Sequence, residues 1–302
     1  MKTMTESNKL EYAEKNAVVN GIRLTYFERG LAFRTQKPTL LFLHATGFHA
    51  RVWDKIVKGL GDYHIVAVDQ RGHGRSEKRM IQHWHEFIAD VEALIEHLDL
   101  TNIIGIGHSM GAHALIGAAS TLQHRFNSLI AIDPVIPDES AFQEPLVDST
   151  PPEEKHPTAR RRREFDSPEA MAERLIDKGS YRVFDPEMFR DYCEYGLLPN
   201  PEGQGYVLAC PPEIEASIYM SSRSNGKIYD AVRSIDLPVL VLRAKAITKD
   251  RDPLDFSFSP TWPGLAATFK RGKEIHFPEN THFLPMELPD RITAIIKYEL
   301  KS

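Results

Sequence analysis

Ser109 lies in the pattern Gly107-x-Ser109-x-Gly111, directly after the apolar run Ile103–Ile106. The pattern is typical of a nucleophile elbow, a sharp turn from a strand into a helix that exposes a serine hydroxyl above a sheet. The glycines suit such a turn because a side chain there would collide with the neighbouring strand or helix. Three fixed residues also recur by chance, so the hypothesis requires a base, an acid and an oxyanion hole elsewhere in the chain.

His282 is the predicted base. A serine hydroxyl is a poor nucleophile at neutral pH until a base removes its proton, and an imidazole, with an ordinary pKa of about 6.5, suits that task. His282 follows the predicted strand Glu274–Phe277 in the loop Thr281-His282-Phe283. His276 is a poorer candidate because it lies within that strand.

Three aspartates are candidates for the acid that orients His282. The chain order of serine, acid and histidine favours the loop after the strand Leu237–Leu242, but no acid stands in its first few residues. Asp252 and Asp255 come later in that loop, and Asp133 follows the preceding strand, Ser128–Ile132. Any of the three would orient the histidine and stabilise the imidazolium ion.

A candidate oxyanion hole follows the apolar run Thr39–Leu43 in the loop His44-Ala45-Thr46-Gly47. A small-residue loop after a strand leaves a backbone N–H free to bind a developing oxyanion. We predict the N–H groups of Thr46 and Met110 as the two donors. The alternative is an ordinary tight turn with a structural His44. A second loop, Asp69–Ser76, is rich in glycine but lacks P-loop spacing, and we interpret it as structural.

Alternating strands and helices must position these residues. The Asn20-Gly21 turn predicts a hairpin over Ala17–Phe27, and apolar residues from Phe87 to Leu98 recur at helical spacing. This alternation predicts an α/β fold with a mostly parallel sheet flanked by helices. Ligands bind at the carboxyl ends of such strands, where the predicted Ser109, His44, Asp133 and His282 loops all lie.

The chain between the strands ending near Asp133 and beginning near Leu237 has a different character. Prolines cluster there, and Ser167-Pro168 predicts a helix start with Ser167 as N-cap. Arg160–Arg163 could hold an anionic substrate, although charge runs usually mark a solvated helix face. The predicted division is a polar N-terminal segment (1–15), a first part of the core (16–134), a mainly helical lid insertion (135–236) and a second part of the core (237–302). In the last part we predict a helix from Trp262 to Phe269 and a closing apolar-striped helix.

Composition excludes several other classes of protein. The 302 residues carry a formal charge of −5, which leaves no basic footprint for nucleic acid. No apolar run reaches the roughly 18 residues of a membrane span, and the N-terminus lacks a signal-peptide core. Two cysteines, Cys193 and Cys210, provide neither a disulfide framework nor metal-ligand spacing. We therefore expect a cytoplasmic protein without a metal or an organic cofactor, and the oligomeric state is not predicted.

These motifs together resemble the α/β-hydrolase superfamily over about Ala17–Leu300. The resemblance implies a lid after the sixth core strand. It also makes Asp133 an alternative to the usual acid position after Leu242, because some haloalkane dehalogenases and lactone hydrolases place the acid there. The stretch from Asp255 to Pro263 also looks similar to the segment that follows the same strand in haloalkane dehalogenases, in which the acid has moved to the earlier position. We favour Asp133, then Asp255, then Asp252. One departure is Ala45, where a glycine commonly follows the histidine.

The predicted reaction is hydrolysis of a small to medium carboxylic ester or lactone through an acyl-enzyme, with a small hydrophobic ester-like substrate under the lid. Ser109 argues against haloalkane dehalogenases and epoxide hydrolases, which use aspartate at the elbow. The alternatives are carbon–carbon bond or thioester hydrolysis by the same fold, and a non-catalytic ligand-binding receptor.

Overall fold

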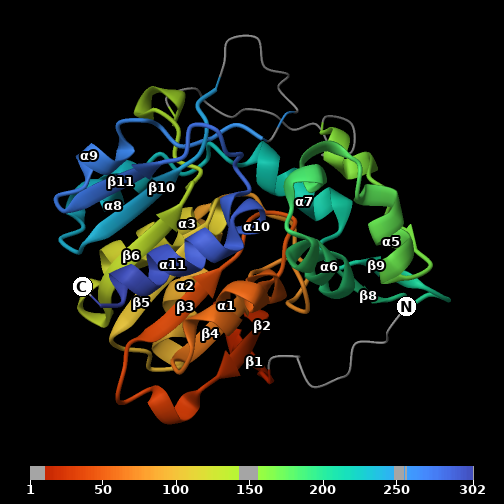
Figure 1. Cartoon of the computed structure of the whole chain (residues 1–302), viewed down its shortest axis with the longest axis horizontal. Helices are drawn as coiled ribbons and strands as arrows, with labels where there is room; N and C mark the ends of the chain where they lie inside the picture. The colour runs from red at the N-terminus through yellow and green to blue at the C-terminus, as the bar shows by residue number, and fades with distance from the viewer. Residues whose placement is uncertain (1–10, 143–155, 248–254, 256, 302) are drawn as a thin grey trace.

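A twisted eight-stranded sheet forms the centre of the molecule (Figure 1). The computed structural model describes residues 11–142, 156–247, 255 and 257–301. The strand order is β1-β2-β4-β3-β5-β6-β10-β11. Strand β2 is antiparallel to both of its neighbours, and all the other neighbouring strands in this sheet are parallel. This confirms the predicted α/β class. The strands are β1 (Ala13–Val19), β2 (Ile22–Arg29), β3 (Thr39–Leu43), β4 (His64–Asp69), β5 (Ile103–His108), β6 (Phe126–Ile132), β10 (Val239–Arg243) and β11 (Gly272–His276).

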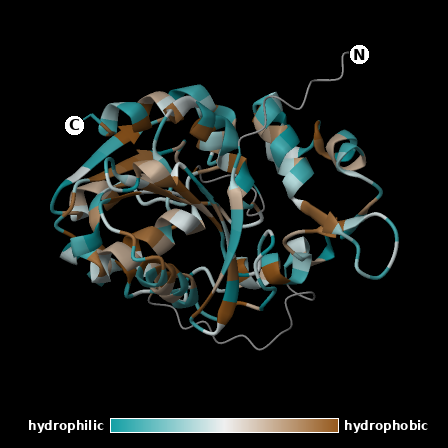
Figure 2. Cartoon of the chain, turned by 90° about the horizontal axis from the view of Figure 1, so that it is seen from below, coloured by the Kyte–Doolittle hydropathy of each residue, from teal (hydrophilic) through white to brown (hydrophobic). Residues whose placement is uncertain are grey.

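Helices cover both faces of this sheet, which is why its central strands read as continuous apolar runs. In β3, Leu41 and Leu43 pack into one apolar cluster, and Leu40 and Phe42 pack into the other. Figure 2 shows the apolar strands enclosed between amphipathic helices. The first cluster includes residues of α2 (His85–His97), α3 (Met110–Thr121), α8 (Ile228–Ser234) and α9 (Leu265–Thr268). The second includes residues of α1 (Asp54–Leu60), α10 (Leu284–Glu287) and α11 (Pro289–Glu299).

Between β6 and α8 the chain leaves the sheet and builds a layer beside it, coloured green to teal in Figure 1. We call residues 156–222 the inserted segment. Besides helices it contains a small antiparallel sheet in the order β7-β9-β8, which the sequence did not predict. Ser167 is the predicted N-cap, since its Oγ accepts a hydrogen bond from the Ala170 N–H at 3.2 Å. Its elements are the short helices η6 (Pro157–Arg160) and η7 (Gly179–Val183), the helices α5 (Pro168–Leu175), α6 (Pro186–Tyr195) and α7 (Pro212–Met220), and the strands β7 (Glu164–Phe165), β8 (Leu197–Pro199) and β9 (Tyr206–Leu208).

Several element boundaries differ from the sequence-based prediction. β1 begins at Ala13, inside the predicted polar segment, and residues 1–10 lie outside the described part. α8 falls within the predicted insertion 135–236 but packs on the core, because Ile228 and Val232 are fully buried there. α9 begins only at Leu265, since the Trp262 N–H donates to the Ile136 carbonyl instead of entering a helix. None of the described helices is long and apolar enough to cross a membrane.

Candidate active site

Ser109 stands at the turn between β5 and α3, as the elbow pattern predicts. Its backbone has φ 58° and ψ −118°, a conformation that costs a non-glycine residue energy and is often found at functional sites. A Cβ on Gly111 would lie 2.5 Å from the Leu43 carbonyl oxygen of the neighbouring strand. The glycine therefore lets α3 approach β3 closely enough to hold the turn.

Ser109, His282 and Asp133 form a continuous hydrogen-bonded chain. The Ser109 Oγ lies 2.9 Å from His282 Nε2, and His282 Nδ1 lies 2.6 Å from Asp133 Oδ2. The hydroxyl donates to Nε2, and the Nδ1–H donates to the carboxylate. All three residues are buried. We call these three residues the Ser109 cluster.

Asp133 is the aspartate that the fold brings to His282. Its Oδ1 accepts hydrogen bonds from the Ala244 N–H at 2.9 Å and the Ser259 Oγ at 2.6 Å. The carboxylate is thus held from two sides, with Oδ2 left for His282. Asp255 instead lines a neighbouring cavity, where its Oδ1 accepts from the Ser257 N–H at 2.9 Å. Asp252 lies outside the described residues.

The two residues predicted for the oxyanion hole touch each other: the Thr46 hydroxyl donates to Met110 Sδ at 3.5 Å. Met110 is the first residue of α3, so its N–H has no acceptor within the helix. Among the described residues, none accepts a hydrogen bond from the Thr46 N–H. Both backbone donors are therefore available beside Ser109.

Two buried histidines hold the Thr46 loop in place. The Gly47 N–H donates to His73 Nε2, and the Gln70 N–H donates to His44 Nε2, both at 3.0 Å. Burial lowers the pKa of His44 to about 4 and the pKa of His73 well below its ordinary value. Both rings are consequently neutral and can accept, so the loop interpreted as structural supports the Thr46 loop.

Comparison with known proteins agrees with this fold. The model of the alpha/beta hydrolase family matches residues 40–295. The chain belongs to the alpha/beta hydrolase family.

The family's members differ widely in sequence from this chain. It is 34% identical to 2-(acetamidomethylene)succinate hydrolase from Mesorhizobium japonicum over 98 residues, which span 32% of this chain and 35% of that protein. It is 22% identical to Lipase LipV from Mycobacterium tuberculosis over 86% of this chain and 92% of that one. The crystal structure of E-2-(acetamidomethylene)succinate hydrolase aligns with a TM-score of 0.75 at 21% identity, covering 97% of this chain and 100% of that one. At that identity the structural likeness shows the fold alone.

In this alpha/beta hydrolase, His108 makes a contact with His282 that the sequence did not predict. Its Nε2–H donates to the backbone carbonyl of His282 at 2.8 Å, and the two rings lie 5.0 Å apart. Burial, followed by the nearby His282 ring, lowers the pKa of His108 well below its ordinary value. A neutral His108 therefore fixes the loop that carries His282. Adjacency to Ser109 was its only signal in the sequence.

A cavity of about 700 Å³ lies next to the Ser109 cluster. Its lining includes Thr46 of the predicted oxyanion loop and both neighbours of His282, Thr281 and Phe283. One wall is aromatic: Phe283 lies 5.5 Å from Phe184 of the inserted segment and 6.1 Å from Phe48, measured between ring centroids. The cavity can thus accommodate an apolar group beside the serine.

Of the four consecutive arginines, only Arg161 reaches this cavity. Arg160, Arg162 and Arg163 are exposed, as expected of a solvated face, whereas Arg161 is half-buried and pairs with Glu215. No periodic pattern in the sequence distinguishes Arg161 from its neighbours. Its partner is 54 residues away in the chain.

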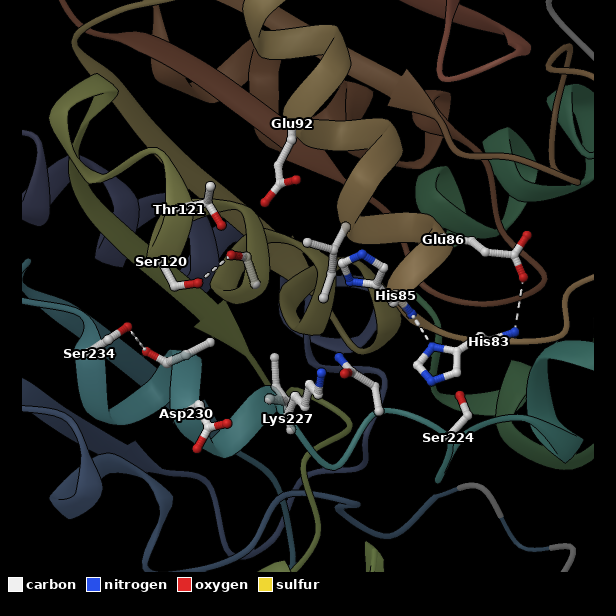
Figure 3. Close-up of a pocket in the computed structure, with 15 residues that line it drawn as sticks. His83, His85, Glu86, Glu92, Ser120, Thr121, Ser224, Lys227, Asp230 and Ser234 are labelled. Atoms are coloured by element: carbon white, nitrogen blue, oxygen red, sulfur yellow. Dashed lines mark hydrogen bonds between the residues drawn. The ribbon is translucent and has the colours of Figure 1, made fainter.

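A second cavity, also about 700 Å³, lies between α2, α3 and α8 (Figure 3). It shares no lining residue with the first cavity. Three of its polar groups are linked: the His85 N–H donates to His83 Nδ1, and the His83 N–H donates to Glu86, as the dashed lines show. Within the described residues, no group of three or more His, Cys, Asp or Glu side chains is arranged to hold a metal ion.

Proposed function

We propose that this protein is a serine hydrolase that cleaves a small to medium carboxylic ester or lactone through an acyl-enzyme intermediate. The observation that carries the proposal is the hydrogen-bonded chain from Asp133 through His282 to the Ser109 hydroxyl, with contacts of 2.6 and 2.9 Å. The names of the relatives, which include a hydrolase and a lipase, support hydrolysis as the reaction class.

In the first half of the reaction, His282 Nε2 takes the hydroxyl proton as Ser109 Oγ attacks the carbonyl carbon. Asp133 stabilises the resulting imidazolium ion, and the Thr46 and Met110 N–H groups bind the oxyanion. The imidazolium then gives its proton to the departing alkoxide as the carbon–oxygen bond breaks. Water attacks the acyl-enzyme with His282 again as base, and releases the acid and free Ser109.

The surroundings of Ser109 favour this chemistry. The strained turn holds the hydroxyl in position before substrate arrives, so little reorganisation is needed at the moment of reaction. The inserted segment contributes Phe184 to the wall of the cavity, and we assign it the role of a lid that excludes water. A dry site strengthens the oxyanion contacts.

The test is hydrolysis of p-nitrophenyl butyrate by the wild type and by Ser109→Ala. Removing the nucleophile of such a chain lowers kcat by about 10⁴- to 10⁶-fold. Ser120→Ala is the matched control, because Ser120 also lies on α3 but its hydroxyl bonds only to the Gly117 carbonyl. It should retain wild-type turnover.

A fluorophosphonate probe separates an enzyme from a ligand-binding receptor. It should label wild type and Ser120→Ala at Ser109, and it should not label Ser109→Ala. Undiminished ester turnover by Ser109→Ala, or a wild type that neither reacts with the probe nor hydrolyses any ester, would contradict the proposal.

A further inference from the structure

The cavity beside Ser109 has a polar wall in addition to its aromatic wall. Arg161 donates to Glu215, and its other terminal nitrogen lies 3.3 Å from the Tyr181 hydroxyl and 3.5 Å from the Tyr192 hydroxyl. The two tyrosine hydroxyls are 3.1 Å apart. All four residues line the cavity and belong to the inserted segment. We call them the Arg161 cluster.

Donors exceed acceptors in the Arg161 cluster. A guanidinium group has five N–H donors, and three of its hydrogen bonds go to Glu215, Tyr181 and Tyr192. Since both tyrosine oxygens accept from Arg161, only one tyrosine O–H can donate to the other tyrosine. Among the described residues, two N–H groups of Arg161 and one tyrosine O–H group therefore have no acceptor.

Glu215 supplies the counter-charge of Arg161 without accepting all of its N–H groups. It is buried against the predicted oxyanion loop, where a Cβ on Gly47 would lie 2.7 Å from its Oε1. The Arg161 cluster and the predicted oxyanion loop therefore line the same cavity. A buried arginine without a counter-charge would be costly in the free enzyme, so Glu215 keeps it in place. The Arg161 side chain is still 28% exposed, and this exposed part borders the cavity.

We propose that the Arg161 cluster binds a carboxylate of the substrate, so that the enzyme prefers esters or lactones whose acyl part carries a second, remote carboxylate. The inference rests on the proposed serine hydrolase function. Arginine suits a carboxylate because each of its N–H groups can donate a charge-assisted hydrogen bond to a carboxylate oxygen. The remaining carboxylates that line the cavity are occupied: Glu215 accepts from Arg161, and Asp255 accepts from the Ser257 N–H. Lys245 adds a second cation to the lining.

The test compares pairs of substrates that differ only in charge. Monoethyl succinate, glutarate and adipate are matched with the ethyl keto-esters in which the carboxylate is replaced by an acetyl group. Ethanol release gives kcat/KM for each. For the chain length that fits best, wild type should favour the monoester over its keto-ester at least about tenfold, the effect of one charge-assisted hydrogen bond.

Variants then locate the preference. Arg161→Gln should lower the monoester to keto-ester ratio about 10- to 100-fold, mainly through KM, and Tyr181→Phe should lower it less. The double variant Arg161→Gln with Glu215→Gln removes both charges. If the lower substrate ratio of Arg161→Gln came only from repulsion by an unpaired Glu215, the double variant would regain the wild-type ratio. Arg163→Gln is the matched control, because Arg163 pairs with Glu213 and is exposed, and it should keep the wild-type ratio.

Calorimetric binding of glutarate to wild type and Arg161→Gln provides a readout that needs no turnover. Binding that weakens at least about tenfold in Arg161→Gln, but not in Arg163→Gln, supports the carboxylate site even if no ester is cleaved. Equal kcat/KM for each charged and neutral pair in wild type would overturn it, as would an Arg163→Gln effect as large as that of Arg161→Gln. Neither result would affect the Ser109 assignment.

Discussion

The Ser109 cluster and the Arg161 cluster lie beside the same cavity but are held in different ways. Backbone groups at the ends of strands hold the first, together with the Ser259 hydroxyl: the Ser109 N–H donates to the Ile132 carbonyl at 2.9 Å, and the Ala244 N–H donates to Asp133. Side chains of the inserted segment hold the second, through Arg161, Glu215 and the two tyrosines. One cluster is fixed by strand register, and the other depends on side-chain identity.

Under the two proposals above, this difference separates chemistry from selectivity. A substitution in the Arg161 cluster can change which acyl group fits without moving a strand, whereas a substitution in the Ser109 cluster affects every substrate alike. The Arg161 cluster contacts the predicted oxyanion loop, which contains Thr46, where Glu215 packs on Gly47. Variants on each side of that contact, and at it, therefore test whether the two regions have separate roles.

The largest effect is expected for Asp133→Asn. The amide cannot stabilise the imidazolium ion and favours the wrong tautomer of His282, so kcat should fall by about 10⁴-fold. The loss should be the same for monoesters and keto-esters, which is measured as an unchanged substrate ratio. Asp255→Asn is the control and should lose less than about tenfold. Equal losses in both variants would contradict the assignment of the acid.

A smaller effect is expected for Gly47→Ala, at the contact between Glu215 and the predicted oxyanion loop. Gly47 has φ +78°, and the added Cβ would meet Glu215 Oε1 at 2.7 Å. We expect a stability loss of about 1–2 kcal/mol from the backbone conformation. Displacement of the Thr46 loop should also lower kcat/KM by about 10- to 100-fold.

Gly21→Ala separates these two effects. Gly21 has φ +68° but nothing within 4 Å of an added Cβ, and it lies in the β1–β2 turn. Chemical denaturation should show a stability loss similar to that of Gly47→Ala, with ester turnover unchanged. If Gly47→Ala also keeps wild-type kcat/KM, the contact with Glu215 does not position the Thr46 loop.

An effect on stability alone, without a change in the site, is expected for pH and His113 of α3, whose contacts Val135 and Asn225 flank the inserted segment. Its ring contacts the Val135 carbonyl and the Asn225 amide, both at 3.0 Å, and burial lowers its pKa to about 4. An unfolded histidine has a pKa of about 6.5. Its stabilising contribution is therefore complete above about pH 6.5 and is lost as the pH falls towards 4, because only the unfolded chain binds the proton.

Urea denaturation at several pH values measures this contribution. Between pH 6.5 and 4.5 the wild type should lose about 2 kcal/mol more unfolding free energy than His113→Gln. The exposed His97→Gln variant controls for loss of a surface histidine. Parallel curves for wild type and His113→Gln would show that His113 is not held neutral by its buried contacts.

Sequence patterns predicted the parts of the site that depend on local geometry. The elbow at Ser109, the loop containing Thr46 and the strand ends that carry Asp133 and His282 follow from periodicity, glycine placement and chain order. The sequence did not predict that three of Arg160–Arg163 are exposed and one lines the cavity. A run of like charges contains no pattern that shows which residue pairs with a distant carboxylate. The contact from His108 to the His282 carbonyl was equally invisible.

By itself, the sequence determined that this protein forms a mostly parallel sheet with a serine at a sharp turn, since short-range sterics and hydrophobic spacing suffice for both. Only the tertiary structure decided which aspartate meets His282 and which arginine reaches the cavity. Those contacts join residues 149 and 54 positions apart. They depend on strand order and on the packing of the inserted segment, which bring together residues that have no local relation in the chain.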